Sequence, residues 1–245
     1  YIAYGRNDRP SQSELIKIGN GRDIKMHGIQ TRLFDRHGLG SKSATKELIG
    51  KIKEISPDII HLHNIHGYYI NIEILFNYLQ NSNIPVVWTF HDCWPITGHC
   101  AHFTFVGCEK WKTQCSNCPQ KENYPSSWLV DRSEKNFHLK KELFTSLSNL
   151  TLVPVSKWLS GILKESYLQH YPLNVIHNGI NTEVFKPSSD KVFRIKYSLE
   201  NKFILLGVAT SWGSKKGLYD FIELSKLLKT DYQIVLVGLT KKQIE

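Results

Sequence analysis

The alternation of apolar runs with amphipathic segments is the first feature of this chain. Short runs that are apolar almost throughout are typical of strands buried on both faces of a parallel sheet. Such runs occupy residues 58–63, 85–90, 150–155, 174–177, 203–209 and 232–237. Ile2 to Tyr4 has the pattern of the end of another strand, one that leads into Gly5. These runs predict a sheet that is mainly parallel.

Between these runs, apolar side chains recur every three or four residues, which predicts amphipathic helices. The apolar stripes comprise Ala44, Leu48, Ile52 and Ile55; Leu139, Leu143 and Leu147; and Leu218, Phe221, Ile222, Ser225 and Leu228. Because strands and helices alternate, the sequence predicts a doubly wound α/β architecture.

Two stretches break the alternation. Residues 92–131 are far longer than the roughly 2–6 residues of an ordinary βα loop, so they need a staple or a function. Asn-Gly at 178–179 and Pro-Ser-Ser at 187–189 indicate a linker. We expect one domain at 1–185, which carries the loop at 92–131, and the start of a second at 190–245. The chain is expected to be cut at both ends.

The composition is typical of a globular protein, with 41% of the 245 residues hydrophobic and 22% charged. No stretch approaches the roughly 18 uninterrupted apolar residues of a membrane span, and the first residues lack the layout of a signal peptide. We therefore expect a cytoplasmic protein, and peripheral contact with the inner membrane stays an open alternative.

The net charge of +9 suits nucleic acid, an anionic membrane surface or a phosphate-bearing substrate. The lysines are scattered over predicted helix faces, as at Lys46, Lys51 and Lys141, and the sequence has no arginine-rich arm. A solvated basic surface explains this pattern better than nucleic-acid binding does.

Polar side chains follow the predicted strands at the ends where an open parallel sheet binds its ligands. His63 ends the run at 58–63, directly after Leu62. Asn64, His66 and Tyr68 follow it, and His91 follows the run at 85–90. Imidazole, amide and phenol groups hydrogen-bond sugar hydroxyls, so this set favours a carbohydrate ligand. A single histidine of this kind is as often a structural residue; convergence of two strand ends would favour a site.

Lys215 and Lys216 precede Gly217 at the predicted start of a helix. Backbone N–H groups, the helix dipole and two ammonium groups together can bind a diphosphate. The same pattern also occurs in ordinary solvated turns, so it is weak by itself.

Four of the five cysteines lie in the long loop with the spacing C-x7-C-x6-C-x2-C: Cys100, Cys108, Cys115 and Cys118. Four thiolates can close a tetrahedral structural zinc site and stiffen such a loop. The spacing matches no common zinc-finger signature, so free thiols are an alternative and disulfides a less favoured one. Cys93 is expected to be a buried, inert thiol rather than a nucleophile.

Several short motifs occur in a characteristic order: HDCWPITGHC at 91–100, CSNCPQ at 115–120, VSKWL at 155–159, NGIN at 178–181 and FKP at 185–187. Together they are similar to family-4 glycosyltransferases of capsule and exopolysaccharide clusters. The resemblance runs nearly the full chain. It implies a GT-B fold, in which two Rossmann-like domains with parallel sheets face each other across a cleft; the second is incomplete here.

The resemblance also implies an activity. Enzymes of this type move a sugar from a nucleotide-linked donor, such as a UDP- or GDP-sugar, to a glycan or lipid-linked acceptor. They retain the anomeric configuration and use no catalytic metal.

His91 matches the family histidine that contacts the transferred sugar, and Lys216 matches the lysine that binds the donor diphosphate. His63, Asn64, His66 and Tyr68 would lie on the acceptor side, by position rather than by a motif match. Ser211 stands where the family usually has an arginine, and Lys215 would supply the second charge.

The family's glycine-rich turn and its late pair of glutamates are not among these residues, so we expect no measurable turnover from the 245-residue chain alone. Two alternatives remain: a zinc-containing basic nucleic-acid-binding protein, and a non-catalytic sugar-binding module on the same fold.

Overall fold

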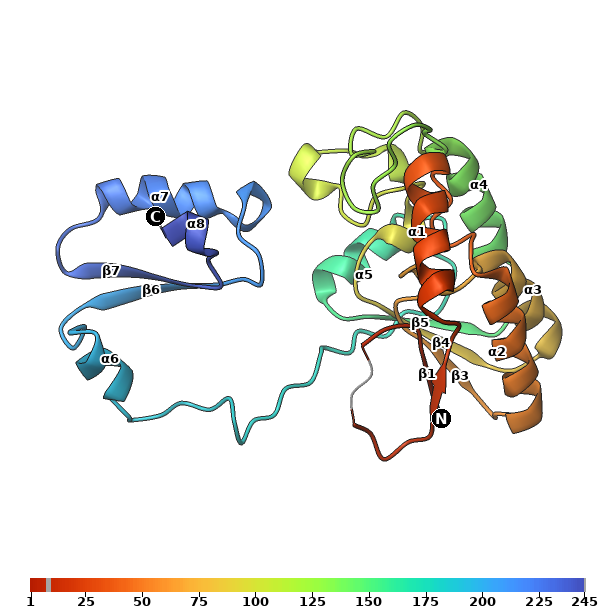
Figure 1. Ribbon diagram of the computed structural model, residues 1–245, viewed down its shortest axis with the longest axis horizontal. Helices are drawn as coiled ribbons and strands as arrows, with labels where there is room; N and C mark the ends of the chain where they lie inside the picture. The colour runs from red at the N-terminus through yellow and green to blue at the C-terminus, as the bar shows by residue number, and fades with distance from the viewer. Residues whose placement is uncertain (8–9, 245) are drawn as a thin grey trace. The chain divides into compact units, whose positions relative to one another are not determined.

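The chain divides into two compact units, Tyr1–Asn178 and Gly179–Glu245. The computed structural model describes residues 1–7 and 10–244 and is drawn in Figure 1. Every strand pair in the described part of both units is parallel, so the prediction of a parallel α/β protein is confirmed.

The first unit contains two groups of strands. β1 (Ile2–Tyr4) pairs with β2 (Leu15–Lys17), and a three-stranded sheet has the order β3-β4-β5. The strands of that sheet are β3 (Ile60–Leu62), β4 (Val86–Phe90) and β5 (Leu150–Pro154).

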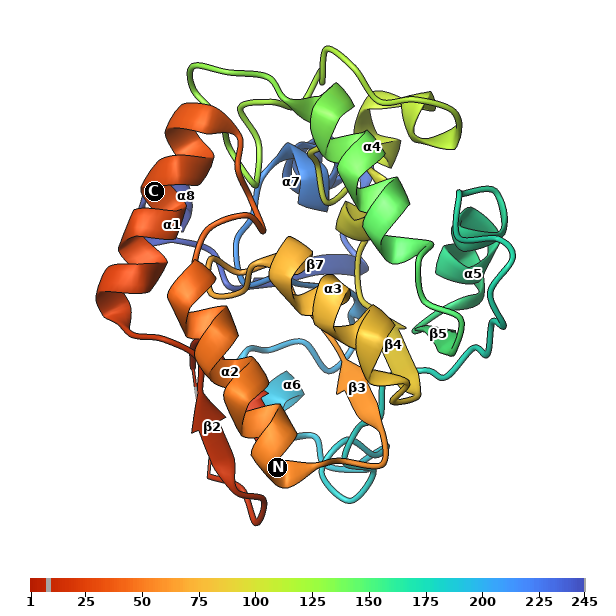
Figure 2. The same ribbon diagram turned by 90° about the vertical axis from the view of Figure 1, so that its right-hand side faces the viewer.

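The long helices of the first unit are α1 (Gly21–Phe34), α2 (Lys42–Ile55), α3 (Ile72–Ser82), α4 (Ser133–Phe144) and α5 (Lys157–Lys164). Figure 2 shows α2, α3 and α4 side by side in front of the strands. Three of these helices have an N-cap side chain whose oxygen accepts a backbone N–H of the first turn: Asn20 for α1, Asn71 for α3 and Ser156 for α5.

The core of the first unit lies between β4 and helices α3 and α4. Trp88 and Phe90 are two positions apart on β4 and therefore point to the same face of the sheet. Phe76 of α3 and Phe144 of α4 pack against Trp88, with ring centroids 5.5 and 4.9 Å away. All four side chains are fully buried, so this face of the sheet is closed to ligands.

An apolar slot separates β1 from β3. It encloses about 510 Å³ and is lined by strand residues such as Ile2 and Ile60 and by Leu48 and Ile52 of α2. Each of these two strands pairs with one neighbour only in the described part of the chain.

The segment 92–131 contains no α-helix or strand, as its lack of periodicity predicts. Its only regular elements are three short 3-10 helices: η1 (Trp94–Ile96), η2 (Thr104–Val106) and η3 (Lys110–Lys112).

The prediction of a strand at 174–177 is wrong. Leu173 forms an isolated parallel bridge with Leu152 of β5. The amides of Asn174 and Ile176 donate to carbonyls of β5, so this backbone is extended beside the sheet. Pro172 lacks an amide proton, and the ladder is too short to form a strand.

The second unit is smaller. β6 (Phe203–Val208) pairs with β7 (Tyr232–Val237), and η4 (Ser214–Lys216) leads into α7 (Leu218–Leu227). Two short helices, α6 (Val192–Lys196) and α8 (Lys241–Ile244), complete it.

Candidate active site

The carboxyl ends of β3 and β4 bring two distant histidines into contact. His63 follows β3 and His91 follows β4, and their rings stack with centroids 5.3 Å apart. The Nδ1 atom of His63 lies 3.0 Å from Nε2 of His91, which is a hydrogen bond. Both residues are exposed, so a ligand can reach them. The sequence alone left open whether two strand ends converge. In the structure they do.

The hydrogen bond between the imidazoles restricts their charge, because one nitrogen must donate and the other must accept. Burial, followed by the charges of His61 and His91, lowers the pKa of His63. His61 contacts the Thr89 hydroxyl at 2.8 Å, and the Trp88 indole N–H donates to the His63 carbonyl at 3.1 Å. Both strands thus position the rings, and the lowered pKa of His63 favours its neutral form.

A second pair also joins the loops that follow β3 and β4. His66 is buried, and its Nε2 lies 2.9 Å from Oδ2 of Asp92, while the other carboxylate oxygen accepts the amide of Trp94 at 2.9 Å. Burial alone would raise the Asp92 pKa, but the contact with His66 and the Trp94 amide together hold it below its ordinary value. His66 therefore fixes the loop after β4, and its burial keeps it from direct contact with a large ligand.

Tyr68 and Asn64 occupy the remainder of the loop after β3. Tyr68 has a left-handed backbone (φ 68°), and the guanidinium carbons of Arg6 and Arg32 lie 5.6 and 6.0 Å from its ring centroid. Asn64 is exposed, and its carbonyl accepts the hydroxyl of Tyr69. The acceptor-side residues expected from sequence thus share one loop, with two positive charges beside it.

Two functional-site neighbours, His27 and His37, were missed by the sequence analysis. His37 is buried, and its ring centroid lies 4.9 Å from that of Tyr68 and 5.3 Å from that of Trp94. In the described part of the chain neither of its ring nitrogens has a hydrogen-bond partner. Burial lowers its pKa well below the ordinary value, so the ring is neutral. Neither histidine follows a predicted strand, so strand-end reasoning could not find them.

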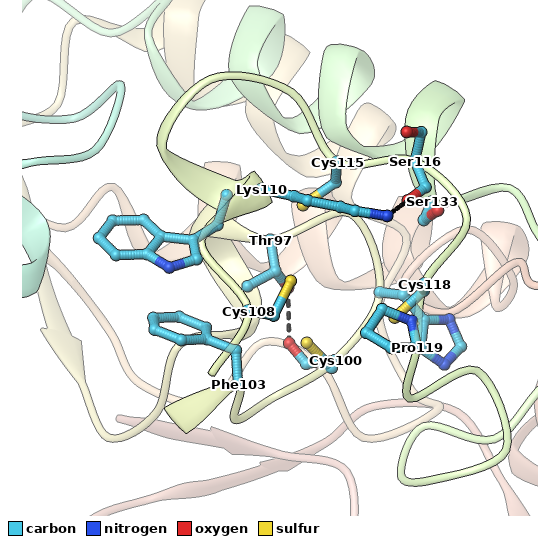
Figure 3. A pocket seen from close by; sticks show the side chains of 12 residues that line it. Thr97, Cys100, Phe103, Cys108, Lys110, Cys115, Ser116, Cys118, Pro119 and Ser133 are labelled. Carbon is cyan, nitrogen blue, oxygen red and sulfur yellow. Dashed lines mark hydrogen bonds between the residues drawn. The ribbon is translucent and has the colours of Figure 1, made fainter. Parts of the chain in front are cut away.

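The cysteine-rich loop continues directly from this site. All five thiols are free, and Cys100, Cys108, Cys115 and Cys118 line one small cavity (Figure 3). Among residues 1–7 and 10–244, no three His, Cys, Asp or Glu side chains already stand in a metal-binding arrangement. Cys93 does not line this cavity; burial raises its pKa to about 12, as expected for an inert thiol.

The predicted phosphate-binding lysines lie in the second unit, in the loop between β6 and α7. Lys215 and Lys216 lie in η4, and both are exposed. The buried Trp212 anchors this loop, because its indole N–H donates to the carbonyl of Val237 at 2.8 Å. The amides of Lys216 and Gly217 are already bonded within the turn. Those two amides are therefore not available to a phosphate.

A model of the family described as Glycosyltransferase Family 4 matches residues 2–184, most of the chain. The chain belongs to glycosyltransferase family 4. The resemblance drawn from the HDCW, CSNC and VSKW motifs is thereby confirmed.

Two curated relatives of this family-4 chain match only part of it. WcaC of Escherichia coli (strain K12), named for glycosyl transfer in colanic acid biosynthesis, is 34% identical over 121 residues, which are 47% of this chain and 29% of WcaC. Glycogen synthase of Mycoplasma mobile is 25% identical over 162 residues, 62% of this chain and 32% of the enzyme. The chain thus spans about a third of the length of these relatives.

The structural comparison agrees with the GT-B fold. Sucrose-phosphate synthase from Thermosynechococcus elongatus superposes with a TM-score of 0.54 and 14% identity, over 83% of this chain and 43% of that chain. At this identity the likeness concerns the fold alone. In the residues that the structure describes, no helix of the family-4 chain is long and apolar enough to span a membrane.

Proposed function

We propose that this family-4 chain is part of a retaining glycosyltransferase that moves a sugar from a nucleotide-sugar to a glycan or lipid-linked saccharide. The observation that carries the proposal is the stacked His63–His91 pair at open strand ends, where parallel sheets bind ligands. The similarity to WcaC, named for colanic acid biosynthesis, favours a role in bacterial surface polysaccharide synthesis. Family membership favours this function over the nucleic-acid-binding alternative.

In this proposal the histidine pair binds the reacting sugar. His91 contacts the hydroxyls of the transferred sugar, and the hydrogen bond from His63 fixes which His91 nitrogen donates and which accepts. Arg6 and Arg32, beside Tyr68, place positive charge near the acceptor loop. That charge would suit an acceptor carrying a phosphate or carboxylate, as lipid-linked saccharides do.

Lys215 and Lys216 are proposed to bind the diphosphate of a UDP- or GDP-linked donor. Negative charge grows on the diphosphate as the glycosidic bond breaks, and a nearby ammonium group stabilises that charge more in the transition state than in the ground state. No metal ion takes part in this step. His91 and Lys216 belong to different units, so activity measurements test whether both contribute to one reaction.

The test is a transfer assay on the complete gene product, with release of nucleoside diphosphate measured over a panel of UDP- and GDP-sugars. His91→Ala is expected to lower kcat by about 100-fold or more, and Lys216→Ala to lower kcat/KM to a similar extent. Lys216→Arg should recover part of the loss, because the charge is kept.

Two surface variants serve as controls. His138→Ala removes an exposed histidine of α4, and Lys226→Ala removes an exposed lysine of α7 that pairs with Glu223. Both should leave turnover within about twofold. Sugar-nucleotide binding without any transfer by the complete protein would contradict the proposal and favour the sugar-binding module.

A further inference from the structure

The cysteine-rich loop joins β4 to α4 and carries the sequence directly after His91. Its four cysteines come from well-separated points of the loop, yet they surround one space in Figure 3. That cavity encloses about 10 Å³, which is about the size of a single water molecule or one metal ion. A polynuclear iron–sulfur cluster would need more room.

Backbone amides already point at two of the sulfur atoms. The N–H of Gly98 donates to the sulfur of Cys115, and the N–H of Gln120 donates to the sulfur of Cys118. Cys100 and Cys118 also form a thiol–thiol hydrogen bond. Amide-to-sulfur hydrogen bonds stabilise thiolates, and such outer partners orient metal ligands in proteins.

A buried histidine at the cavity wall gives an independent indication of a missing partner. His99 is 2% exposed, and its Nδ1 lies 2.6 Å from Oδ1 of Asp35. Its Nε2 atom is buried and has no hydrogen-bond partner in the described part of the chain. An unpaired buried polar atom costs roughly 1–3 kcal/mol, so a partner in the cavity is favoured.

We propose that this cavity binds one structural Zn²⁺ ion through the thiolates of Cys100, Cys108, Cys115 and Cys118. Zinc prefers a closed tetrahedral set of this kind in structural sites. The thiols are not yet at ligand positions, so binding requires them to move inward and to release their protons. His99, which lines the same cavity, is then a positioning residue.

A zinc ion at this site would crosslink parts of the first unit that are distant in sequence. Asp35 holds His99 with one carboxylate oxygen and accepts the amide of Arg132, at the start of α4, with the other at 2.8 Å. The metal would therefore tie together α1, the loop and α4 around the loop residues that follow His91. This proposal does not depend on transferase activity.

The first experiment measures metal content and coordination. The protein purified without chelators should contain one zinc per chain by inductively coupled plasma mass spectrometry, and no stoichiometric iron. Replacement by Co²⁺ should give the intense d–d bands of a tetrahedral site and thiolate charge-transfer bands for four sulfurs. Absence of zinc, stoichiometric iron, or a disulfide among these cysteines would overturn the proposal.

Single variants separate ligands from neighbours. Cys100→Ser, Cys108→Ser, Cys115→Ser and Cys118→Ser should each lower zinc content at least tenfold after dialysis, whereas Cys93→Ala should keep one zinc per chain. His99→Gln should keep zinc and the four-thiolate Co²⁺ spectrum. Loss of zinc in His99→Gln, with retention in any one of the four serine variants, would overturn the four-thiolate assignment.

A second measurement uses the wild-type protein, so it remains valid if the variants fold poorly. Trypsin cleavage at Lys110 and Lys112, which are exposed in the loop, should accelerate at least tenfold when zinc is removed from the wild-type protein by a chelator. Readdition of Zn²⁺, but not Mg²⁺, should restore protection. Cleavage that is indifferent to the chelator would contradict a stapling role.

Discussion

His27 shows how one side chain can make the stability of the first unit depend on pH. Its Nε2 accepts the amides of Gly38 and Gly40 at 3.1 and 3.2 Å, and its Nδ1 contacts the Ser41 hydroxyl at 2.9 Å. A proton on Nε2 would remove the acceptor of both hydrogen bonds from these backbone amides. Burial accordingly lowers the pKa of His27 to about 4. The folded protein therefore keeps this ring neutral.

Acid should destabilise the protein through this residue. The unfolded chain binds a proton at the ordinary histidine pKa of about 6.5, so between pH 6.5 and 4 only the unfolded state gains it. The free energy of unfolding should be highest above pH 6.5 and fall by at most about 3 kcal/mol down to pH 4.

Urea denaturation at several pH values measures this effect. His27→Gln is expected to be less stable at pH 7, because the paired amides lose their acceptor, and to show a shallower decline between pH 6.5 and 4. His138→Gln, at an exposed position, should keep the wild-type slope. An unchanged slope in His27→Gln would show that other groups cause the decline.

At this scale the sequence predicted only part of the candidate site. His63 and His91 directly follow strands, and that rule found them without knowledge of the fold. Asp35 contacts His99, and His37 contacts Trp94, between segments far apart in the chain, and no local pattern encodes such contacts. Lys215 and Lys216 are exposed residues, whereas the amides of Lys216 and Gly217, which the sequence argument counted among the phosphate-binding N–H groups, are used within the turn.

The attachment of the long loop to α4 depends on one glycine. A Cβ atom added at Gly98 would lie 1.9 Å from the carbonyl oxygen of Ser133, the first residue of α4. Because the obstacle is backbone, a side chain cannot turn away to relieve it. Gly98→Ala should therefore cost more than about 2 kcal/mol of stability and detach the loop.

Thermal unfolding of Gly98→Ala, with trypsin cleavage in the loop as a second readout, measures this cost. Gly50 offers a matched control, because it lies within α2 and a Cβ there meets nothing within 4 Å. Gly50→Ala should stabilise the protein by about 0.5–1 kcal/mol through helix propensity. A Gly98→Ala protein as stable as the wild type would mean that the loop does not pack tightly against α4.

Strands and helices were predicted best where the apolar run or the amphipathic stripe was clear in the sequence. β4, β5, β7 and the helices α2 and α7 lie close to their predicted positions. The sequence analysis did not name β2, α1, α3 or α5. β2 has only three residues, and α1 has few buried apolar positions, since its buried residues are His27, Gly28 and Thr31. Polar burial of that kind leaves no hydrophobic stripe to detect.

The two units should differ in local stability. Among the described residues of the second unit, only Leu199, Gly207 and Trp212 are buried, whereas β4 and β5 of the first unit are mostly buried. Regions with few buried apolar side chains open at low free-energy cost.

Hydrogen exchange followed by mass spectrometry measures this difference in the protein. Amides of β6 and β7 should exchange at least about 100-fold faster than those of β4 and β5. A saturating donor nucleotide should slow the exchange around η4 if Lys216 binds the diphosphate, and Lys216→Ala should abolish that protection. Equal protection in both units would show that the second is stabilised by contacts other than its own core.

The slot between β1 and β3 has a consequence for how this protein behaves at high concentration. The edges of two separate sheets border an apolar space, and each edge strand pairs with one neighbour in the described part of the chain. We expect an extended apolar peptide of suitable length to pair with such an edge. A segment of a neighbouring molecule that entered the same opening would link two chains, so we expect a short apolar peptide in excess to reduce aggregation at high concentration.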